Sequence, residues 1–302
     1  MIHLFAIGSN WYDWAVATIV FMGSASFSVP SLRVLARHHC LSGVVTQPDR
    51  PAGRGRKLSP SEVKSDALTL GLSVITPSDL GESQCMAQIR AWKPDVIVVV
   101  AFGRILGPEI LSLPKHGCLN VHASLLPRHR GASPIAAAIQ SGDTESGVTL
   151  MKMVRGLDKG PLIAHYATPI LDNHTAGSLT DTLAILGSQL LHDQLGPYLA
   201  GDTTPVPQDE SLATYAPMLK KADGRLLFTI PAMLLARQVR AMSPWPGTFV
   251  VRDGRMLKIL EARAIDGRAP PGKIVRFDDD VVVGTSAGLL RLDRIQPSGG
   301  RP

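Results

Sequence analysis

The stretch Pro94-Asp-Val-Ile-Val-Val-Val-Ala101 contains five consecutive β-branched residues. A run of this length and composition is typical of a strand that is buried on both faces of a sheet. Two similar runs come earlier, Ala17-Thr-Ile-Val-Phe-Met-Gly23 and Leu41-Ser-Gly-Val-Val-Thr46, and helical patterns at 27–37, 59–70 and 82–92 separate the runs. This alternation predicts an α/β fold with a Rossmann-like, mostly parallel sheet and helices on both faces.

The turn after the first strand differs from that of dinucleotide-binding proteins. It reads Gly23-Ser-Ala-Ser-Phe-Ser, without the Gly-x-Gly-x-x-Gly pattern that lets a backbone approach a pyrophosphate. No nicotinamide cofactor is therefore implied.

Two polar residues interrupt a later strand-like stretch, Cys118-Leu-Asn-Val-His-Ala-Ser124. Residues two apart on a strand share a face, so the Asn120 carboxamide and the His122 imidazole should point into one space while Val121 packs behind them. An amide donor beside a group that titrates near neutral pH suits a reaction in which a carbonyl oxygen gains charge and a proton moves. The pair indicates acyl transfer chemistry.

Taken singly, these residues have ordinary structural explanations. An Asn-x-His pattern at a strand end is common, and Asp158 in Gly156-Leu-Asp-Lys-Gly160 is typical of a turn or a helix cap. Their surroundings favour a site, because the turn-rich Ser124-Leu-Leu-Pro127 and a helix expected from Ser133 to Gln140 follow the strand at once. Loops in this position commonly carry functional groups.

Several motifs in one register resemble the formyltransferases that use 10-formyltetrahydrofolate. In chain order they are Asn120-Val-His122, Ser124-Leu-Leu-Pro127, Arg130-Gly131, Pro134, Gly147-Val-Thr149 and Gly156-Leu-Asp-Lys-Gly160. The resemblance implies that Asn120, His122 and Asp158 are catalytic, that 10-formyltetrahydrofolate is the co-substrate and that no metal is needed. It also implies folate contacts from Ser124, Leu125, Leu126 and Pro127 and from the turn that contains Phe102, Gly103 and Ile105.

A cationic segment from Gln47 to Lys64 is rich in Gly, Pro and Arg, and we expect an exposed, mobile loop rather than a helix or a strand. Its cations are Arg50, Arg54, Arg56, Lys57 and Lys64, opposed only by Asp49 and Glu62. A solvated basic loop without a partner is the plain alternative. The segment is similar to the loop with which the methionyl-tRNA formyltransferases of this family grip the acceptor arm of initiator tRNA, which implies initiator methionyl-tRNA as the partner.

The chain divides into four parts by its patterns. Residues 1–18 are an atypical amino-terminal extension whose role the sequence does not define, and residues 19–200 are the expected catalytic domain. The polar, Pro-bearing residues 201–220 have the composition of a linker. Residues 221–302 contain a helix and then five short β segments, which predict an OB-like β-barrel that binds tRNA.

Composition agrees with a polyanionic partner. The formal net charge is +6, and the cations outside the basic segment gather around Lys220, Lys221, Arg225, Arg237 and Arg240. The three cysteines, Cys40, Cys85 and Cys118, lack metal or redox spacing and are expected to be reduced core thiols. Neither a membrane span nor a secretory signal is evident, so we expect a bacterial cytoplasmic protein, and nothing demands more than a monomer.

Two other functions fit parts of the pattern. A folate-dependent formyltransferase acting on a sugar-nucleotide amine could share the polar trio, but it would have little use for the basic segment. A non-catalytic tRNA-binding protein on the same scaffold could use the basic segment, but it would not need Asn120, His122 and Asp158.

Overall fold

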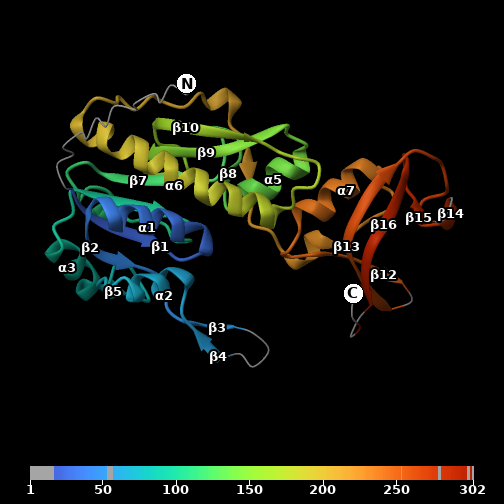
Figure 1. Ribbon diagram of the computed structural model, residues 1–302, viewed down its shortest axis with the longest axis horizontal. Helices are drawn as coiled ribbons and strands as arrows, with labels where there is room; N and C mark the ends of the chain where they lie inside the picture. Colours follow the sequence, from blue (N-terminus) through green and yellow to red (C-terminus); the bar gives the residue numbers. More distant parts are fainter. Residues whose placement is uncertain (1–16, 53–56, 253, 278–279, 298–299, 301–302) are drawn as a thin grey trace, which may run out of the picture.

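The computed structural model describes residues 17–52, 57–252, 254–277, 280–297 and 300, so the extension of residues 1–16 lies outside the described residues. A seven-stranded sheet forms the centre of the first domain, with the order β10-β9-β7-β6-β1-β2-β5 (Figure 1). Its strands are β1 Thr18–Gly23, β2 Cys40–Val45, β5 Val74–Ile75, β6 Val96–Val100, β7 Cys118–His122, β9 Glu145–Lys152 and β10 Leu162–Pro169. The first five are parallel, and β9 and β10 add an antiparallel edge beside β7. The expected mostly parallel sheet is confirmed.

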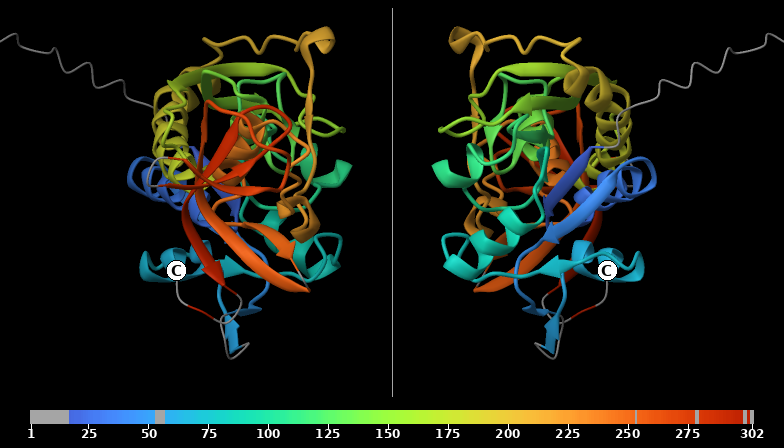
Figure 2. Two further views of the ribbon diagram at one scale, coloured as in Figure 1. Left: turned by 90° about the vertical axis from the view of Figure 1, so that its right-hand side faces the viewer. Right: turned by 90° about the vertical axis from the view of Figure 1, so that its left-hand side faces the viewer.

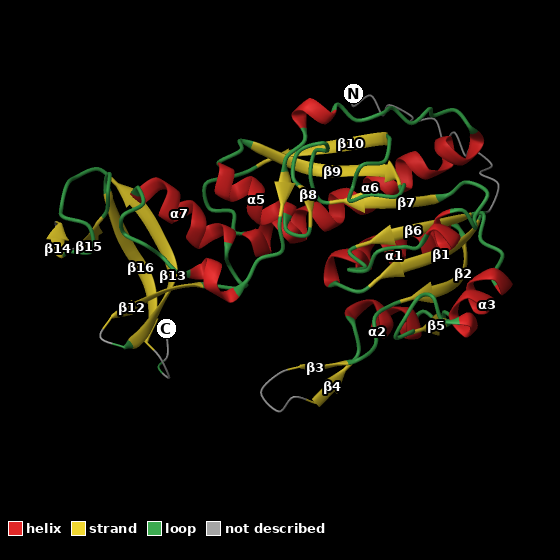
Figure 3. Cartoon of the chain, turned by 180° about the vertical axis from the view of Figure 1, so that it is seen from behind, coloured by secondary structure: helices red, strands yellow, loops and turns green. Residues whose placement is uncertain are grey.

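Buried side chains fill both faces of this sheet. Residues Ile19, Phe21, Val98 and Val121 lie in one cluster, and the alternate residues Val20, Met22, Val99 and Cys118 lie in the other. Helices cover both clusters (Figure 3). They are α1 Val29–His38, α2 Glu62–Thr69, α3 Ser83–Ala91, α4 Pro108–Leu111, α5 Pro134–Ser141 and α6 Ala176–Ala200, with a short 3-10 turn, η1 Ser26–Ser28. Each fully buried Val or Ile contributes about 1.5–3 kcal/mol, which explains why uninterrupted β-branched runs form the central strands.

The second domain is a five-stranded antiparallel sheet packed on helix α7 Ala232–Ala241. Its strands are β12 Thr248–Arg252, β13 Arg255–Ile265, β14 Ile274–Phe277, β15 Asp280–Gly284 and β16 Leu289–Pro297. The five expected β segments are confirmed. The strand order β12-β13-β16-β15-β14 places the last strand at the centre, and among the described residues no pairing between β12 and β14 closes the sheet into a ring.

The two domains share buried contacts. Ala241 at the end of α7 belongs to the same buried cluster as the side chains of α6. The Gly177 amide at the start of α6 donates to the Ser243 carbonyl at 2.9 Å. The C-terminal sheet lies at one end of the molecule (Figure 1), and the left view of Figure 2 faces that end.

Residues 201–220 differ from a flexible linker. They run back along the first domain, where Leu162 and Val206 exchange backbone hydrogen bonds. The two-residue strand β11 Tyr215–Ala216 then pairs in parallel with β8 Arg130–Gly131. Two short 3-10 turns flank β11, η2 Glu210–Leu212 and η3 Lys221–Gly224. Polar composition suggested a solvated spacer, but these backbone groups find protein partners instead of water.

The basic segment also differs from the expected loop. Arg50–Ala52 (β3) and Lys57–Ser59 (β4) pair as two short antiparallel strands, with Pro51 opposite Leu58. An edge position tolerates Pro51 because its missing N–H is not needed by a further strand. We name the paired strands Arg50–Ala52 and Lys57–Ser59 the basic hairpin; these strands project from the first domain in Figures 1 and 2.

In the part of the chain that the structure describes, no helix combines the length and the apolar character needed to cross a bilayer.

One of the three cysteines is not a core residue. Cys85 and Cys118 are buried as expected, but Cys40 is exposed at the first residue of β2, and all three are free thiols. Burial raises the pKa of the Cys118 thiol to about 12 and also raises the pKa of Cys85. The thiolate is the reactive form, so the two buried thiols should be inert at neutral pH.

We therefore expect a thiol reagent at pH 7 to modify Cys40 in the native protein and to reach Cys85 and Cys118 only after unfolding. Peptide mass spectrometry of samples quenched over time measures this order. Modification of Cys118 as fast as Cys40 would show that the core around β7 opens readily.

Candidate active site

Strand β7 places Asn120 and His122 on one face of the sheet, at its carboxyl end. Val121 between them is 2 % exposed and points into the cluster under α6, where an added Cβ at Gly187 would lie 3.0 Å from its Cγ1. Asn120 is half-buried and lies opposite Val99 of β6 and Met151 of β9. The shared face predicted for Asn120 and His122 is therefore present.

The His122 imidazole is 7 % exposed, and both of its ring nitrogens face protein oxygens. Nε2 lies 3.0 Å from the His129 carbonyl oxygen, which can only accept, so Nε2 carries a hydrogen. Nδ1 lies 3.7 Å from Oδ2 of Asp158. This separation is too long for a direct hydrogen bond.

Asp158 reaches the site from the loop after β9. Its backbone has a φ of +50°, in the left-handed region, which is uncommon for an aspartate. Its Oδ2 accepts a hydrogen bond of 2.8 Å from the Gly131 amide and is also the atom that faces His122. The structure thus brings together the imidazole and the distant carboxylate that the sequence analysis selected.

Residues 124–133, which we name the site loop, fold over the carboxyl end of β7. The buried Ser124 hydroxyl donates to the Arg128 carbonyl at 2.6 Å, so it closes the loop on itself. Thr149 of β9 holds the same loop, because its hydroxyl donates to the Ser124 carbonyl at 2.7 Å and accepts from the Leu126 amide at 3.1 Å. Leu126 is buried, and Leu125 and Pro127 are half-buried.

The His129 side chain anchors the carbonyl that meets His122. His129 Nε2 lies 2.7 Å from Oδ2 of Asp143, and Arg128 donates to Oδ1 at 2.6 Å. Burial alone would raise the pKa of Asp143, but the hydrogen bonds from Arg128 and His129 outweigh it and lower the pKa. Asp143 is therefore ionised at neutral pH and fixes this side of the site loop.

The turn after β6 lies beside the carboxyl end of β7, from which the site loop begins, because β6 and β7 are neighbouring strands. The Phe102 ring is buried in the core, so only its backbone is available, and its carbonyl accepts from Gln47 Nε2 at 2.6 Å. Gly103 is exposed with a φ of +74°. Ile105 is 92 % exposed, an unusual position for so apolar a side chain next to a polar site.

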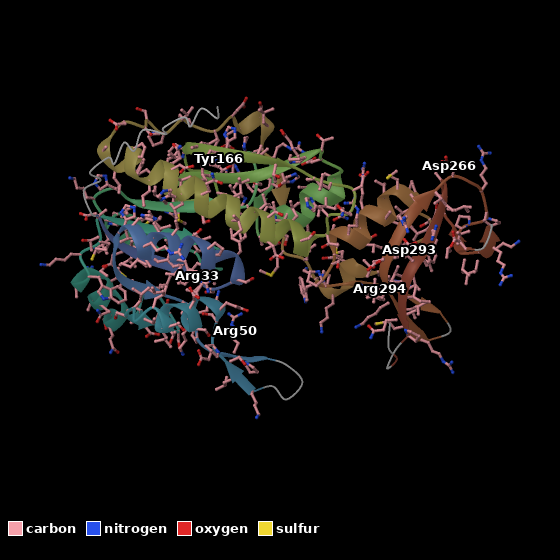
Figure 4. All side chains as sticks on the ribbon, in the orientation of Figure 1. Arg33, Arg50, Tyr166, Asp266, Asp293 and Arg294 are labelled. Carbon is pink, nitrogen blue, oxygen red and sulfur yellow. The ribbon has the colours of Figure 1, made fainter. Side chains whose placement is uncertain are left out.

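The structure describes three of the five cations predicted to bind tRNA, two in the basic hairpin and Lys64 in helix α2. Arg50 lies at the base of the hairpin (Figure 4), Lys57 begins β4, and both are exposed. Lys64 pairs with Asp49 at 2.7 Å, which offsets part of its charge. Arg54 and Arg56 lie outside the described residues. Among the described residues no cluster of His, Cys, Asp or Glu is arranged to hold a metal ion.

Two residues close to Asp158, Arg130 and Gln208, were not predicted as site residues from the sequence. Arg130 is completely buried and was noted only as part of a motif, and Gln208 gave no signal because it lies in an apparent linker. Arg130 donates from Nε and Nη2 to Oε1 of Gln208, at 3.0 and 2.7 Å. Two polar residues so far apart in the chain could be joined only by the fold.

Comparison with known proteins agrees with this fold. Residues 17–195 match the family model described as formyl transferase, and residues 218–302 match the model described as formyl transferase, C-terminal domain. The chain belongs to the formyl transferase family.

Within this family, the chain is most similar in sequence and length to proteins of one kind among the following relatives. The chain is 48% identical over 288 residues to a methionyl-tRNA formyltransferase of Stenotrophomonas maltophilia, and 49% identical over 288 residues to one of Xylella fastidiosa. Each alignment covers 94% of this chain and 94% of the relative. Among solved structures, the N-formyltransferase from Helicobacter canadensis in complex with folinic acid and dTDP-3-aminofucose superimposes with a TM-score of 0.67 at 18% identity, covering 92% of this chain and 98% of that one.

Proposed function

We propose that this enzyme transfers the formyl group of 10-formyltetrahydrofolate to the amino group of initiator methionyl-tRNA, which yields formylmethionyl-tRNA for translation initiation. The observation that carries the proposal is the near-half identity to methionyl-tRNA formyltransferases over almost the full length of both chains. Asn120 and His122 at the end of β7, with Asp158 from the loop after β9, would supply the chemistry that such a transfer needs.

Asn120 is the proposed donor to the formyl oxygen. Attack by the amine on the electrophilic formyl carbon, which the folate co-substrate supplies, builds negative charge on that oxygen. Among the described residues the Asn120 carboxamide has no hydrogen-bonding partner, and it is half-buried at the edge of the site. One well-placed donor of this kind contributes on the order of a hundred- to a thousand-fold in rate.

His122 and Asp158 are proposed to act as a pair. The Nε2 hydrogen of His122 can leave the His129 carbonyl for the formyl oxygen through a small ring movement, as catalytic hydrogen bonds often tighten only with substrate present. Asp158 faces Nδ1 at 3.7 Å, where it would hold the ring in orientation and, through water, help to carry the amine proton to the leaving folate nitrogen.

The folate is proposed to bind between the site loop and the turn after β6. The exposed Ile105 supplies an apolar surface for a ring system, and the exposed Gly103 leaves the backbone accessible. Ser124 and Leu126 are buried, so they would shape the loop, while Leu125 and Pro127 are placed to touch the ligand.

Initiator tRNA is the proposed polyanionic partner. The basic hairpin and the lower ends of β12 and β13 project from the same side of the molecule (Figures 1 and 2). Phosphate contacts from Arg50, Arg54, Arg56, Lys57 and Lys64 would hold the acceptor arm there. The described domain contacts support a division into a catalytic domain at residues 19–200, a connecting segment at 201–220 and a tRNA-binding domain at 221–302. We further propose that the enzyme acts as a monomer in the bacterial cytoplasm.

A direct assay separates this function from its alternatives. Purified enzyme with 10-formyltetrahydrofolate should formylate methionyl-tRNA and leave a dTDP-amino sugar unmodified. Formylation of the amino sugar alone would assign the chain to the sugar-modifying enzymes, whose fold it shares at low identity. Binding of tRNA without formylation of either substrate would favour the non-catalytic alternative.

A further inference from the structure

The segment of residues 206–219, which we name the return segment, is bound to the site loop along its length. The Arg130 amide donates to the Thr214 carbonyl at 2.8 Å, and the His129 amide donates to the Thr214 hydroxyl at 2.8 Å. Further along, the Ala132 amide donates to the Ala216 carbonyl at 2.9 Å. The return segment is therefore packed against the site loop and is more than a tether between the domains.

Arg130 holds the return segment in place through a fully buried guanidinium. Besides Gln208, it binds Glu210 through two hydrogen bonds of 3.0 and 2.9 Å. The hydrogen bond to Glu210 raises the pKa of Arg130, and the same contact lowers the pKa of Glu210. A buried cation without partners would be costly, so Arg130 requires that Gln208 and Glu210 stay in place.

Gln208 connects this clamp to Asp158. While its Oε1 accepts from Arg130, its Nε2 donates to the Asp158 carbonyl at 2.8 Å and to the Gly160 carbonyl at 2.7 Å. These two bonds hold the loop at, and two residues after, the residue with the left-handed φ of +50°. The conformation is uncommon for aspartate, so it persists only where surrounding contacts fix it.

We propose that Gln208 is a positioning residue for Asp158, oriented by Arg130, and that the return segment is thereby a working part of the active site. The proposal rests on the proposed function. Gln208 does not meet the reacting atoms; it fixes the backbone from which the Asp158 carboxylate reaches both the Gly131 amide and Nδ1 of His122. Loss of its two donors would let this carboxylate drift.

The variant Gln208→Glu isolates that link. Its carboxylate keeps an acceptor for Arg130 but presents an acceptor to the Asp158 and Gly160 carbonyls, which removes both hydrogen bonds. We expect kcat for formyl transfer to fall by about ten- to a hundred-fold, the range for a misplacement of about 1 Å. The KM values for the folate and for methionyl-tRNA should stay near those of the unchanged enzyme, because the polar atoms of Gln208 are engaged by Arg130 and by the Asp158 loop.

Two further variants sharpen the comparison. Gln208→Met removes the donors without adding charge and should lower kcat in the same way. The matched control Asp209→Asn lies next to Gln208, caps η2 through its side chain and touches neither Arg130 nor the Asp158 loop, so its kcat should be unchanged.

The position of the Asp158 carboxylate can also be followed without substrate through the Gly131 amide, which donates a hydrogen bond to it. In NMR spectra, Gln208→Glu and Gln208→Met should move the Gly131 amide proton and speed its exchange, while Asp209→Asn should not. Normal kcat and an unchanged Gly131 signal in both Gln208 variants would overturn the proposal. Failure of both to fold would also overturn it, because Gln208 would then be structural. If the unchanged enzyme formylates no methionyl-tRNA yet the Gly131 signal responds, the proposed function fails and the positioning role stands.

Discussion

Replacement of His122 by alanine should lower formyl transfer to methionyl-tRNA by at least about a hundred-fold, since one hydrogen-bond donor to the developing oxyanion and the proton-handling ring are both lost. The imidazole fills a site between the His129 carbonyl and Asp158, and no other described histidine faces that carboxylate. Single-turnover rates with saturating tRNA and folate measure the loss without interference from binding.

Asn120→Ala and Asp158→Ala should give losses of similar size, because each removes a different part of the same stabilisation. The fold should survive, since the main core clusters do not depend on these polar groups. His165→Ala, on the exposed side of edge strand β10, is the matched control and should keep normal turnover. Full activity of the His122 variant would refute the assigned chemistry.

Removal of the basic hairpin's charge should act on tRNA binding and leave the chemical step intact. In the variant that changes Arg50, Arg54, Arg56 and Lys57 to alanine, we expect KM for methionyl-tRNA to rise roughly ten- to a hundred-fold at low salt, with kcat nearly unchanged. The slope of log affinity against log salt concentration should fall by about 0.7 to 0.9 for each lost phosphate contact.

A control for charge alone is the double variant Arg90→Ala, Lys115→Ala. These exposed cations lie at the end of α3 and before β7, near the amino ends of the parallel strands and at the opposite end from the site. Equal effects per charge removed, four in the hairpin variant and two in this control, would mean that tRNA senses only the overall positive charge.

The sequence patterns predicted the sheet and the shared face of Asn120 and His122 because both depend on local order. Five β-branched residues at 96–100 are best satisfied by burial on two faces, and alternation on a strand puts Asn120 and His122 together wherever that strand lies. Asp158 was selected through the resemblance of its motif to a known family, because by itself it is typical of a turn or a helix cap, and its catalytic role stays a prediction.

Composition was a poor guide to residues 201–220 and 50–59, because backbone pairing determines their structure. Residues 201–220 are polar, yet Thr214 and Ala216 bind the site loop through main-chain groups that carry no sequence signal. Gln208 depends on the same unexpected path, and its partner Arg130 lies 78 positions away. The hairpin at 50–59 was hidden in the same way, because Gly, Pro and Arg describe its solvent exposure better than its hydrogen bonds.

The shared burial of Ala241 bears on how the two domains can move. A helix of the second domain that ends inside the core of the first leaves little freedom for a hinge between them, because opening such a hinge would expose apolar surface to water. The spacing between strands β3 and β4 and the C-terminal sheet is therefore fixed by the fold itself.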